Sequence, residues 1–306
     1  MKILLTGATG FIGSNIAKGL LEHGFEVYAT YRSTSTFEKC KHFKNKINWL
    51  NTETSNWKEQ IAVLKPDQLI HVAWDGIDSE NRNNWEIQAH NFWHSKEYFD
   101  LANEYCIKKV ISLGSQAEYG IHDFPVNEMT APAPNDAYGA IKTLTANYQR
   151  NLFDNSETAW YWIRVFSVFG EGENMKWLIP LVISRLLRNE PIKLTSCDQK
   201  YDYLYIEDFV RYIISIVICE ENKSGIYNIC NSESIVLRDL LKIIAELMNV
   251  SSDLLRFGEI HQRPSQNMII AGVYKKFITS FNLEEDTPIG LTEGLRRTIN
   301  YYKKLA

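Results

Sequence analysis

The sequence predicts an α/β fold in which a doubly wound parallel sheet is followed by a smaller C-terminal lobe. Short apolar segments typical of buried strands alternate with helical segments up to about residue 170. The first strand ends in a glycine-rich turn that leads directly into a helix. Beyond residue 170 this alternation stops, and helices are predicted at 176–188, 208–220, 237–249 and 291–304.

In the first part, strands are predicted at 3–5, 25–32, 47–50, 68–74, 108–115 and 159–170, and helices at 14–23, 84–105 and 137–152. Strands that are joined by right-handed helical crossovers lie parallel. Ligands then bind at their carboxyl ends, where Gly10, Trp74, Ser115 and Ser167 should meet. We expect a dinucleotide-binding domain over 1–170 and a substrate-binding lobe over 171–306, from which part of 200–230 could return to the first domain.

The glycine-rich turn has the pattern Gly7-x-x-Gly10-x-x-Gly13 between the first strand and the first helix. Gly7 allows the tight turn, Gly10 lets a pyrophosphate approach the backbone, and Gly13 lets the helix pack closely on the strand. The helix N-terminus presents free N–H groups to a phosphate. This context predicts a Rossmann-like dinucleotide site.

Composition narrows the class of protein. The 306 residues are 45% hydrophobic and 23% charged, with a formal net charge of -4, which is ordinary for a globular protein. Without a basic stripe, nucleic acid is not an expected partner. The apolar runs are too short for membrane insertion, and Met1-Lys2 leads straight into a strand, so we expect a cytoplasmic protein. The five scattered cysteines indicate free thiols in a reduced compartment, and no metal site is expected.

An acid–base pair is predicted on the helix over 137–152. Tyr138 and Lys142 are four residues apart, so the phenol and the ammonium share one helix face. A nearby Lys stabilises phenolate and makes Tyr138 a plausible proton donor or acceptor. Ser115, at the end of the fifth strand, could bind a substrate oxygen beside Tyr138.

These motifs together resemble the extended short-chain dehydrogenases/reductases of the nucleotide-sugar epimerase/dehydratase/reductase superfamily. The segments TGATGFIG, HVAW, SLGSQAEYG, YGAIK, RVFSVFGEGE, QKYDYLYIED and TEGLRRTINYYKK occur in the family's order across essentially the whole chain. The resemblance implies that Tyr138 transfers a proton to or from the sugar, that Lys142 holds the nicotinamide ribose, and that Ser115 orients the sugar oxygen. It also implies that Ala73 and Trp74 line the cofactor cleft.

The expected cofactor contacts come from the glycine-rich turn, the strand ends and the active-site helix: Gly7, Thr9, Gly10, Phe11, Ile12, Gly13, Arg32, Asn51, Ala73, Trp74, Tyr138 and Lys142. In NAD-binding relatives the second strand usually ends in an acid that binds the ribose hydroxyls. Tyr31 stands there, followed by Arg32, which can pair with a 2′-phosphate. The departure favours NADPH.

Other departures concern the substrate. Sugar 4,6-dehydratases that resemble this chain place Asp-Glu after the active-site hydroxyl, whereas Gln116 and Ala117 stand here and cannot eliminate water. Tyr201 replaces a family arginine that binds the diphosphate of the sugar nucleotide. The substrate contacts expected by resemblance are Ser115, Gln116, Trp177 and Arg263.

The predicted reaction is NADPH-dependent reduction of the C4 keto group of a nucleotide-activated 4-keto-6-deoxy sugar. The alternatives are a nucleotide-sugar 4-epimerase with bound NAD and, more remotely, a non-catalytic cofactor-sensing protein, against which the presence of Tyr138 and Lys142 argues. Resemblance also implies a homodimer whose interface is built from the helices over 84–105 and 137–152. The apolar contacts expected there are Phe92, Tyr98, Phe99, Tyr148 and Leu152.

Overall fold

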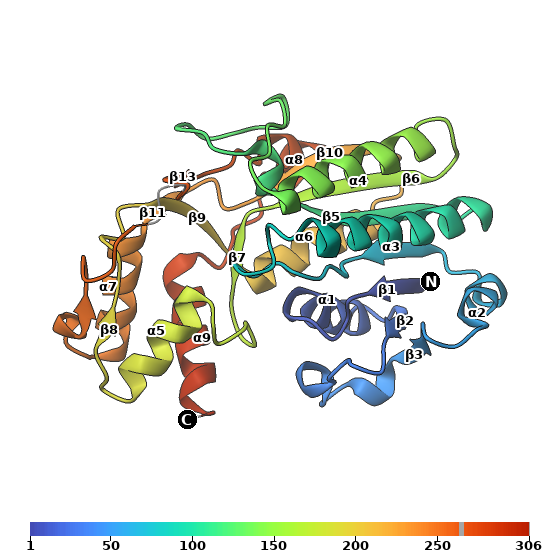
Figure 1. Ribbon diagram of the computed structural model, residues 1–306. Helices are drawn as coiled ribbons and strands as arrows, with labels where there is room; N and C mark the ends of the chain where they lie inside the picture. Colours follow the sequence, from blue (N-terminus) through green and yellow to red (C-terminus); the bar gives the residue numbers. More distant parts are fainter. Residues whose placement is uncertain (263–265, 306) are drawn as a thin grey trace.

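A seven-stranded sheet forms the centre of the larger lobe in the computed structural model, which describes residues 1–262 and 266–305 (Figure 1). Its strands stand in the order β10-β6-β5-β4-β1-β2-β3, and every neighbouring pair is parallel. The strands are β1 (Lys2–Thr6), β2 (Glu26–Tyr31), β3 (Asn48–Asn51), β4 (Gln68–His71), β5 (Lys109–Ser115), β6 (Ala159–Val165) and β10 (Gly225–Ile229). The doubly wound parallel sheet is therefore confirmed.

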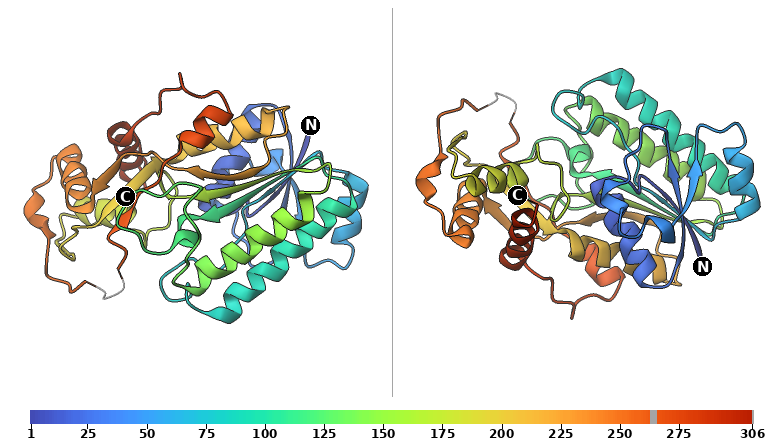
Figure 2. Two further views of the ribbon diagram at one scale, coloured as in Figure 1. Left: turned by 90° about the horizontal axis from the view of Figure 1, so that it is seen from above. Right: turned by 90° about the horizontal axis from the view of Figure 1, so that it is seen from below.

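Helices cover both faces of this sheet (Figure 2). On one face lie α1 (Phe11–Glu22) and α6 (Ile206–Ile218); on the other lie α2 (Trp57–Leu64), α3 (Trp85–Glu104) and α4 (Ala137–Phe153). The strand residues alternate accordingly: Ile3 and Leu5 pack with α1 and α6, whereas Leu4 packs with the opposite layer.

The smaller lobe is built around a second sheet. In it β9 (Lys200–Tyr205) pairs with β7 (Ser167–Phe169), β11 (Ser234–Val236) and β13 (Ile269–Ile270). A two-stranded ladder joins β8 (Ile192–Lys193) to β12 (Leu255–Arg256). The helices of this part of the chain are α5 (Leu178–Leu187), α7 (Leu237–Met248), α8 (Lys275–Ser280) and α9 (Leu291–Lys303), and α5, α7 and α9 pack against one another. The described residues also contain four short 3-10 helices: η1 (Glu38–Cys40), η2 (Lys44–Lys46), η3 (Gln116–Tyr119) and η4 (Ser252–Leu254).

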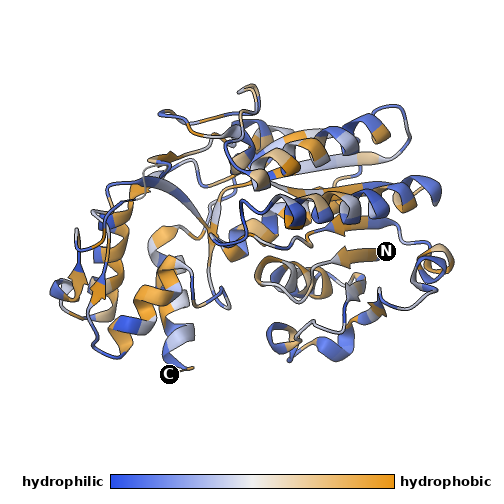
Figure 3. Ribbon diagram, viewed as in Figure 1, coloured by the Kyte–Doolittle hydropathy of each residue, from blue (hydrophilic) through white to orange (hydrophobic). Residues whose placement is uncertain are grey.

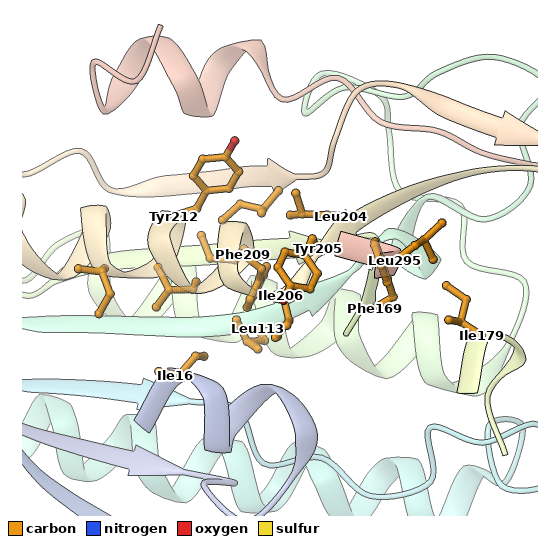
Figure 4. Packing of buried hydrophobic residues seen from close by; sticks show 14 of the residues in the cluster. Ile16, Leu113, Phe169, Ile179, Leu204, Tyr205, Ile206, Phe209, Tyr212 and Leu295 are labelled. Carbon is orange, nitrogen blue, oxygen red and sulfur yellow. The ribbon is translucent and has the colours of Figure 1, made fainter. Parts of the chain in front are cut away.

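One apolar core connects the two lobes. It runs from Ile16 of α1 and Leu113 of β5, through Phe209 of α6, to Ile179 and Leu295 of the small lobe (Figure 4). The helices of the small lobe carry apolar residues along their length, as α7 shows in Figure 3. Because the lobes share buried apolar surface, we expect them to unfold together.

The strand expected at 159–170 is in fact two strands in two sheets. β6 ends at Val165, buried Phe166 follows, and β7 leaves the large sheet to pair with β9. The strand expected over 68–74 stops at His71, so Ala73 and Trp74 belong to the loop after it. α2 was not predicted, and β10 adds the edge strand beside β6.

The helix pair α3 and α4 carries part of the apolar face expected for dimerisation. Tyr98 and Phe99 do not belong to it: they are 1% and 0% exposed and pack beneath the sheet. Their place in the apolar stripe of α3 is that of core residues, and the expectation for them was wrong. Phe92 and Tyr148 are half-buried and contact each other across the two helices, with ring centroids 5.8 Å apart.

Candidate active site

The glycine-rich turn is shaped for close approach of a ligand. Gly7 has φ +72°, and a Cβ there would lie 2.7 Å from the backbone nitrogen of Ala73. A Cβ on Gly13 would lie 2.1 Å from the carbonyl oxygen of Gly7, so helix and turn pack too tightly for a side chain. A Cβ on exposed Gly10 would have the Gly7 carbonyl oxygen as its nearest non-neighbouring atom, at 3.4 Å. The backbone at Gly10 is open where a pyrophosphate would approach.

The beginning of α1 adds free donors to this turn. Gly10 precedes the helix, no side chain caps it, and no acidic residue lies in the first turn. Unpaired N–H groups and the positive end of the helix dipole favour a phosphate at this position. These features fit the dinucleotide that the sequence motif predicts.

Two elements, β5 and α4, bring Ser115, Tyr138 and Lys142 together. Ser115 is the last residue of β5, and Tyr138 and Lys142 lie one turn apart on α4. Asp136 caps this helix by accepting a hydrogen bond from the Gly139 backbone at 2.7 Å. All three candidate side chains are buried, and Tyr138 and Ser115 are close enough for their hydroxyl groups to interact.

The Lys142 ammonium occupies an apolar position. It donates a hydrogen bond of 2.5 Å to the Leu113 carbonyl and lies 3.5 Å from the centre of a Trp74 ring. Burial lowers the pKa of Lys142 to about 7, against which the charge of Glu118 acts. Close to neutrality Lys142 can therefore gain or lose a proton in response to a change beside it.

Tyr138 has an aromatic neighbour, Trp74, and a cationic neighbour, Arg82. Its ring meets the edge of Trp74 at a centroid distance of 6.0 Å, and the Arg82 guanidinium carbon lies 4.3 Å from its ring centre. Burial raises the pKa of the Tyr138 phenol, whereas Arg82 and Ser115 act to lower it. Asp136 holds Arg82 in this position through an ion pair of 2.6 Å.

A buried ion pair lies directly behind Ser115. One carboxylate oxygen of Glu118, Oε1, accepts hydrogen bonds from the Ser115 backbone at 2.9 Å and from Trp162 Nε1 at 2.8 Å. The other, Oε2, accepts from Arg164 Nε at 2.8 Å. Sequence reasoning missed this pair. The signals were the capping-box spacing from Ser115 to Glu118 and the alternation that puts Trp162 and Arg164 on one face of β6.

Two carboxylates lie beside the end of β2, where Arg32 is predicted to bind a phosphate. Arg32 pairs with Asp75, and both the backbone nitrogen and the hydroxyl of Ser33 donate to Glu53, at 2.8 and 3.0 Å. Asn91 holds Asp75 by donating to its carbonyl and accepting from its backbone nitrogen, each at 2.9 Å. The acid missing from β2 is thus replaced by acids that follow β3 and β4, which the sequence order did not reveal.

The remaining predicted contacts are spread around the same edge of the sheet. Thr9, Phe11 and Ile12 lie in the turn and the first turn of α1; Asn51 ends β3, where its side chain accepts from the Glu53 backbone at 3.0 Å. Half-buried Gln116 follows Ser115.

Two predicted substrate residues, Trp177 and Arg263, come from beyond the large sheet. Trp177 precedes α5 and is 41% exposed. Arg263 lies outside the described residues. Tyr201, in place of the family arginine, donates to the Asn267 carbonyl at 2.8 Å and accepts from Gln266.

Among the described residues, no group of His, Cys, Asp or Glu side chains has the arrangement of a metal site. Over the same ranges, 1–262 and 266–305, no helix is long and apolar enough to cross a membrane.

Comparison with known proteins agrees with this geometry. Residues 3–230 match the model of the NAD dependent epimerase/dehydratase family. The chain is 24% identical to the uncharacterized UDP-glucose epimerase YtcB of Bacillus subtilis over 323 residues, covering 100% of this chain and 99% of that protein. It is 27% identical over 258 residues to dTDP-6-deoxy-L-talose 4-dehydrogenase (NAD(+)) of Aggregatibacter actinomycetemcomitans, covering 80% of this chain and 90% of that one. A structure of UDP-glucuronic acid 4-epimerase from Bacillus cereus, in complex with UDP-glucuronic acid and NAD, superposes with a TM-score of 0.87 at 20% identity, covering 100% of both chains. With a family match over most of its length and a turn shaped for a dinucleotide, the chain belongs to the NAD dependent epimerase/dehydratase family.

Proposed function

We propose that this protein reduces the C4 keto group of a nucleotide-activated 4-keto-6-deoxy sugar with NADPH, in deoxysugar or surface polysaccharide biosynthesis. The observation that carries the proposal is the arrangement of Ser115, Tyr138 and Lys142 beside the glycine-rich turn, without an acid free to eliminate water. Gln116 and Ala117 carry no carboxyl group. Both oxygens of the next acid, Glu118, are engaged by Ser115, Trp162 and Arg164.

In this reaction the bound nicotinamide supplies a hydride to the C4 carbon. Tyr138 donates its phenolic proton to the carbonyl oxygen, so that hydride and proton together complete the alcohol. Ser115 donates a hydrogen bond to the same oxygen as negative charge develops on it. Protonated Lys142 stabilises the phenolate that Tyr138 leaves behind.

The choice of NADPH rests on Arg32, whose guanidinium can pair with a 2′-phosphate. Arg32 pairs with Asp75, and the two side chains are 48% and 51% exposed. Exposed ion pairs of this kind contribute little to stability. A phosphate can therefore compete for Arg32.

The relative that carries "4-dehydrogenase" in its name acts at the corresponding sugar carbon, which supports the reaction type.

A second candidate is 4-epimerisation with a retained NAD. It is favoured by Asp75 and Glu53, since carboxylates at the end of β2 are suited to binding ribose hydroxyls. In that case Tyr138 first removes a proton from the C4 hydroxyl and later returns it.

The deciding experiment adds NADPH deuterated at C4 of the nicotinamide to the purified protein with a panel of 4-keto-6-deoxy sugar nucleotides. Stoichiometric oxidation of NADPH and deuterium at C4 of the sugar product are expected. The matched panel of 4-hydroxy sugar nucleotides should give no oxidation. Interconversion of two 4-hydroxy sugars without cofactor consumption would establish the epimerase instead.

For assembly, we propose that the protein forms a homodimer through α3 and α4. Trp93 and Leu144 are 63% and 47% exposed, and half-buried Phe92 and Tyr148 lie in contact between the helices. Phe92 also contacts Trp93, with ring centroids 5.2 Å apart. Exposed apolar side chains on two packed helices, here called the apolar strip of α3 and α4, are typical of a protein–protein interface.

A further inference from the structure

The ion pair between Glu118 and Arg164 is unusual in being completely buried. The two side chains are 0% and 3% exposed, and Arg164 also lies over the ring of Tyr119, with its guanidinium carbon 4.4 Å from the ring centre. Burying two charges costs solvation free energy that their attraction often fails to repay, so an apolar pair of similar size would be about as stable. The charges at this position therefore call for an explanation other than stability.

We propose that Glu118, held in place by Arg164, is a positioning residue that orients Ser115 and supplies the negative charge that keeps the Tyr138–Lys142 pair protonated. The proposal rests on the acid–base role of Tyr138 in the proposed function. Neither Glu118 nor Arg164 is assigned contact with the substrate.

The orientation of Ser115 follows from the hydrogen bonds around it. Its backbone N–H is bound by Glu118 at 2.9 Å, and its side-chain oxygen accepts from the Ala117 backbone at 3.2 Å. One lone pair of the Ser115 hydroxyl oxygen is thus used by the Ala117 N–H of η3. The hydroxyl proton remains free to be donated toward Tyr138 or a substrate oxygen, as the proposed reduction requires.

Trp162 lies beside both Glu118 and the lysine. Its Nε1 binds Glu118, while one of its rings lies 5.9 Å from the Lys142 ammonium. Arg82 and Asp136, from the segments before α3 and α4, act on Tyr138, and Glu118 of η3 acts on Tyr138 and Lys142. Lys142 in turn acts on His71 of β4 and lowers its pKa. Glu118 is the anion that acts on both Tyr138 and Lys142.

The Glu118 carboxylate shifts the pKa of Lys142 and that of Tyr138 in the same direction. Burial lowers the pKa of Lys142, and the Glu118 carboxylate raises it again. Burial raises the pKa of Tyr138, and Glu118 raises it further. A negative charge near both groups favours their protonated forms, which are the forms a proton donor needs at the start of a reduction.

Position 114 is adapted to this arrangement. A Cβ on Gly114 would lie 2.2 Å from Trp162 Nε1 and 2.4 Å from Glu118 Oε1. The space that a side chain would fill is taken by the hydrogen bond between Trp162 and Glu118. The glycine, the tryptophan and the ion pair therefore form one unit behind the end of β5.

The test replaces both charges at once, because Glu118→Gln alone would leave Arg164 buried and unpaired. In the Glu118→Gln/Arg164→Met double variant, the amide can still accept from Ser115 and Trp162, so orientation is kept while charge is lost. If that variant does not fold, the double variant Glu118→Gln/Arg164→Gln replaces it, because it removes the same two charges. Circular dichroism and thermal unfolding establish which variant is folded.

The first readout is the pH dependence of kcat for reduction. We expect the alkaline limb to move to lower pH by about half to one unit in the neutral variant. Arg82→Gln should move it to higher pH, because Arg82 acts on Tyr138 with opposite sign. Trp162→Phe keeps the charge of Glu118 and should leave the limb in place. A lower rate with an unmoved limb in the neutral variant would show a structural role and overturn the proposal.

The second readout does not depend on the reaction. An NMR titration of the Lys142 side chain, assigned with Lys142→Arg, reports its protonation directly. The midpoint should fall in the neutral variant; an unchanged midpoint would refute the electrostatic role of Glu118. A fallen midpoint in a protein that reduces none of the 4-keto sugars would uphold that role and reject the proposed function instead.

Discussion

Arg32 and Asp75 form a two-pronged ion pair, with Nη1 2.9 Å from Oδ2 and Nη2 3.1 Å from Oδ1. The guanidinium that is predicted to bind a 2′-phosphate therefore already has an anionic partner, and it holds the pKa of Asp75 below the ordinary value. Asp75 occupies Arg32 and opposes any phosphate that comes near it.

Replacing Asp75 by Asn should tighten NADPH binding by about tenfold and leave NADH binding nearly unchanged, because a like charge is removed beside the phosphate. Arg32→Ala should weaken NADPH selectively. Dissociation constants from fluorescence titration measure both effects. Glu22→Gln is the control, since this exposed carboxylate lies at the far end of α1, roughly 17 Å from the beginning of that helix. If Asp75→Asn weakens NADH instead, Asp75 is a ribose ligand, as the epimerase would require.

Tyr138→Phe should lower turnover by about 10²–10⁴-fold while cofactor binding stays close to that of the wild type, because only the proton donor is lost. Stopped-flow reduction and cofactor titration measure the two quantities. Tyr148→Phe, on the same helix but bound to Asp100, is the matched control. A Tyr138→Phe enzyme within a few-fold of the wild-type rate would exclude the assignment.

Glu173 should make the protein less stable at alkaline pH. Burial raises the pKa of its carboxyl to about 8, and its Oε2 is buried without a hydrogen-bond partner among the described residues. Its folded-state pKa lies above the unfolded one, so its contribution is fully present below the unfolded pKa and is lost as pH rises through the folded pKa.

We therefore expect Glu173→Gln to raise Tm by roughly 2–5 °C at pH 9, with little effect at pH 4. Scanning calorimetry across this range measures the difference. The exposed pair of Arg185 and Glu190 offers a control in Glu190→Gln. An equal gain in Tm at both pH values would assign the effect to packing rather than ionisation.

Trp93→Glu should convert the proposed dimer to a monomer, because it places a charge in the apolar strip of α3 and α4. Light scattering at micromolar concentration reports the mass. Met129→Glu changes an apolar residue that is more exposed still, 92% against 63% for Trp93, in the loop before α4, and should leave the mass unchanged. A wild-type protein that is already monomeric contradicts the proposal.

Elements whose signals are local could be predicted from the residues alone. The glycine pattern between a strand and a helix, the apolar alternation of the strands, and Tyr138 and Lys142 one helical turn apart each lie within a short segment. Such patterns can be recognised without knowing what packs on them, because backbone sterics and helix periodicity act over a few residues. The parallel sheet and the placing of the candidate catalytic residues at its edge could therefore be predicted.

The tertiary structure alone decided which partners surround those residues. Arg32 and Asp75 are 43 positions apart, and Glu118 and Arg164 are 46 apart. The tertiary structure also places Tyr98 and Phe99 in the core. The amphipathic pattern of the helix does not distinguish apolar side chains that face the sheet from those that face a second subunit. Such contacts depend on strand order and on how the helices are placed across the sheet. Whether a charge is neutralised, buried or free is set by neighbours that the chain brings together only when it folds.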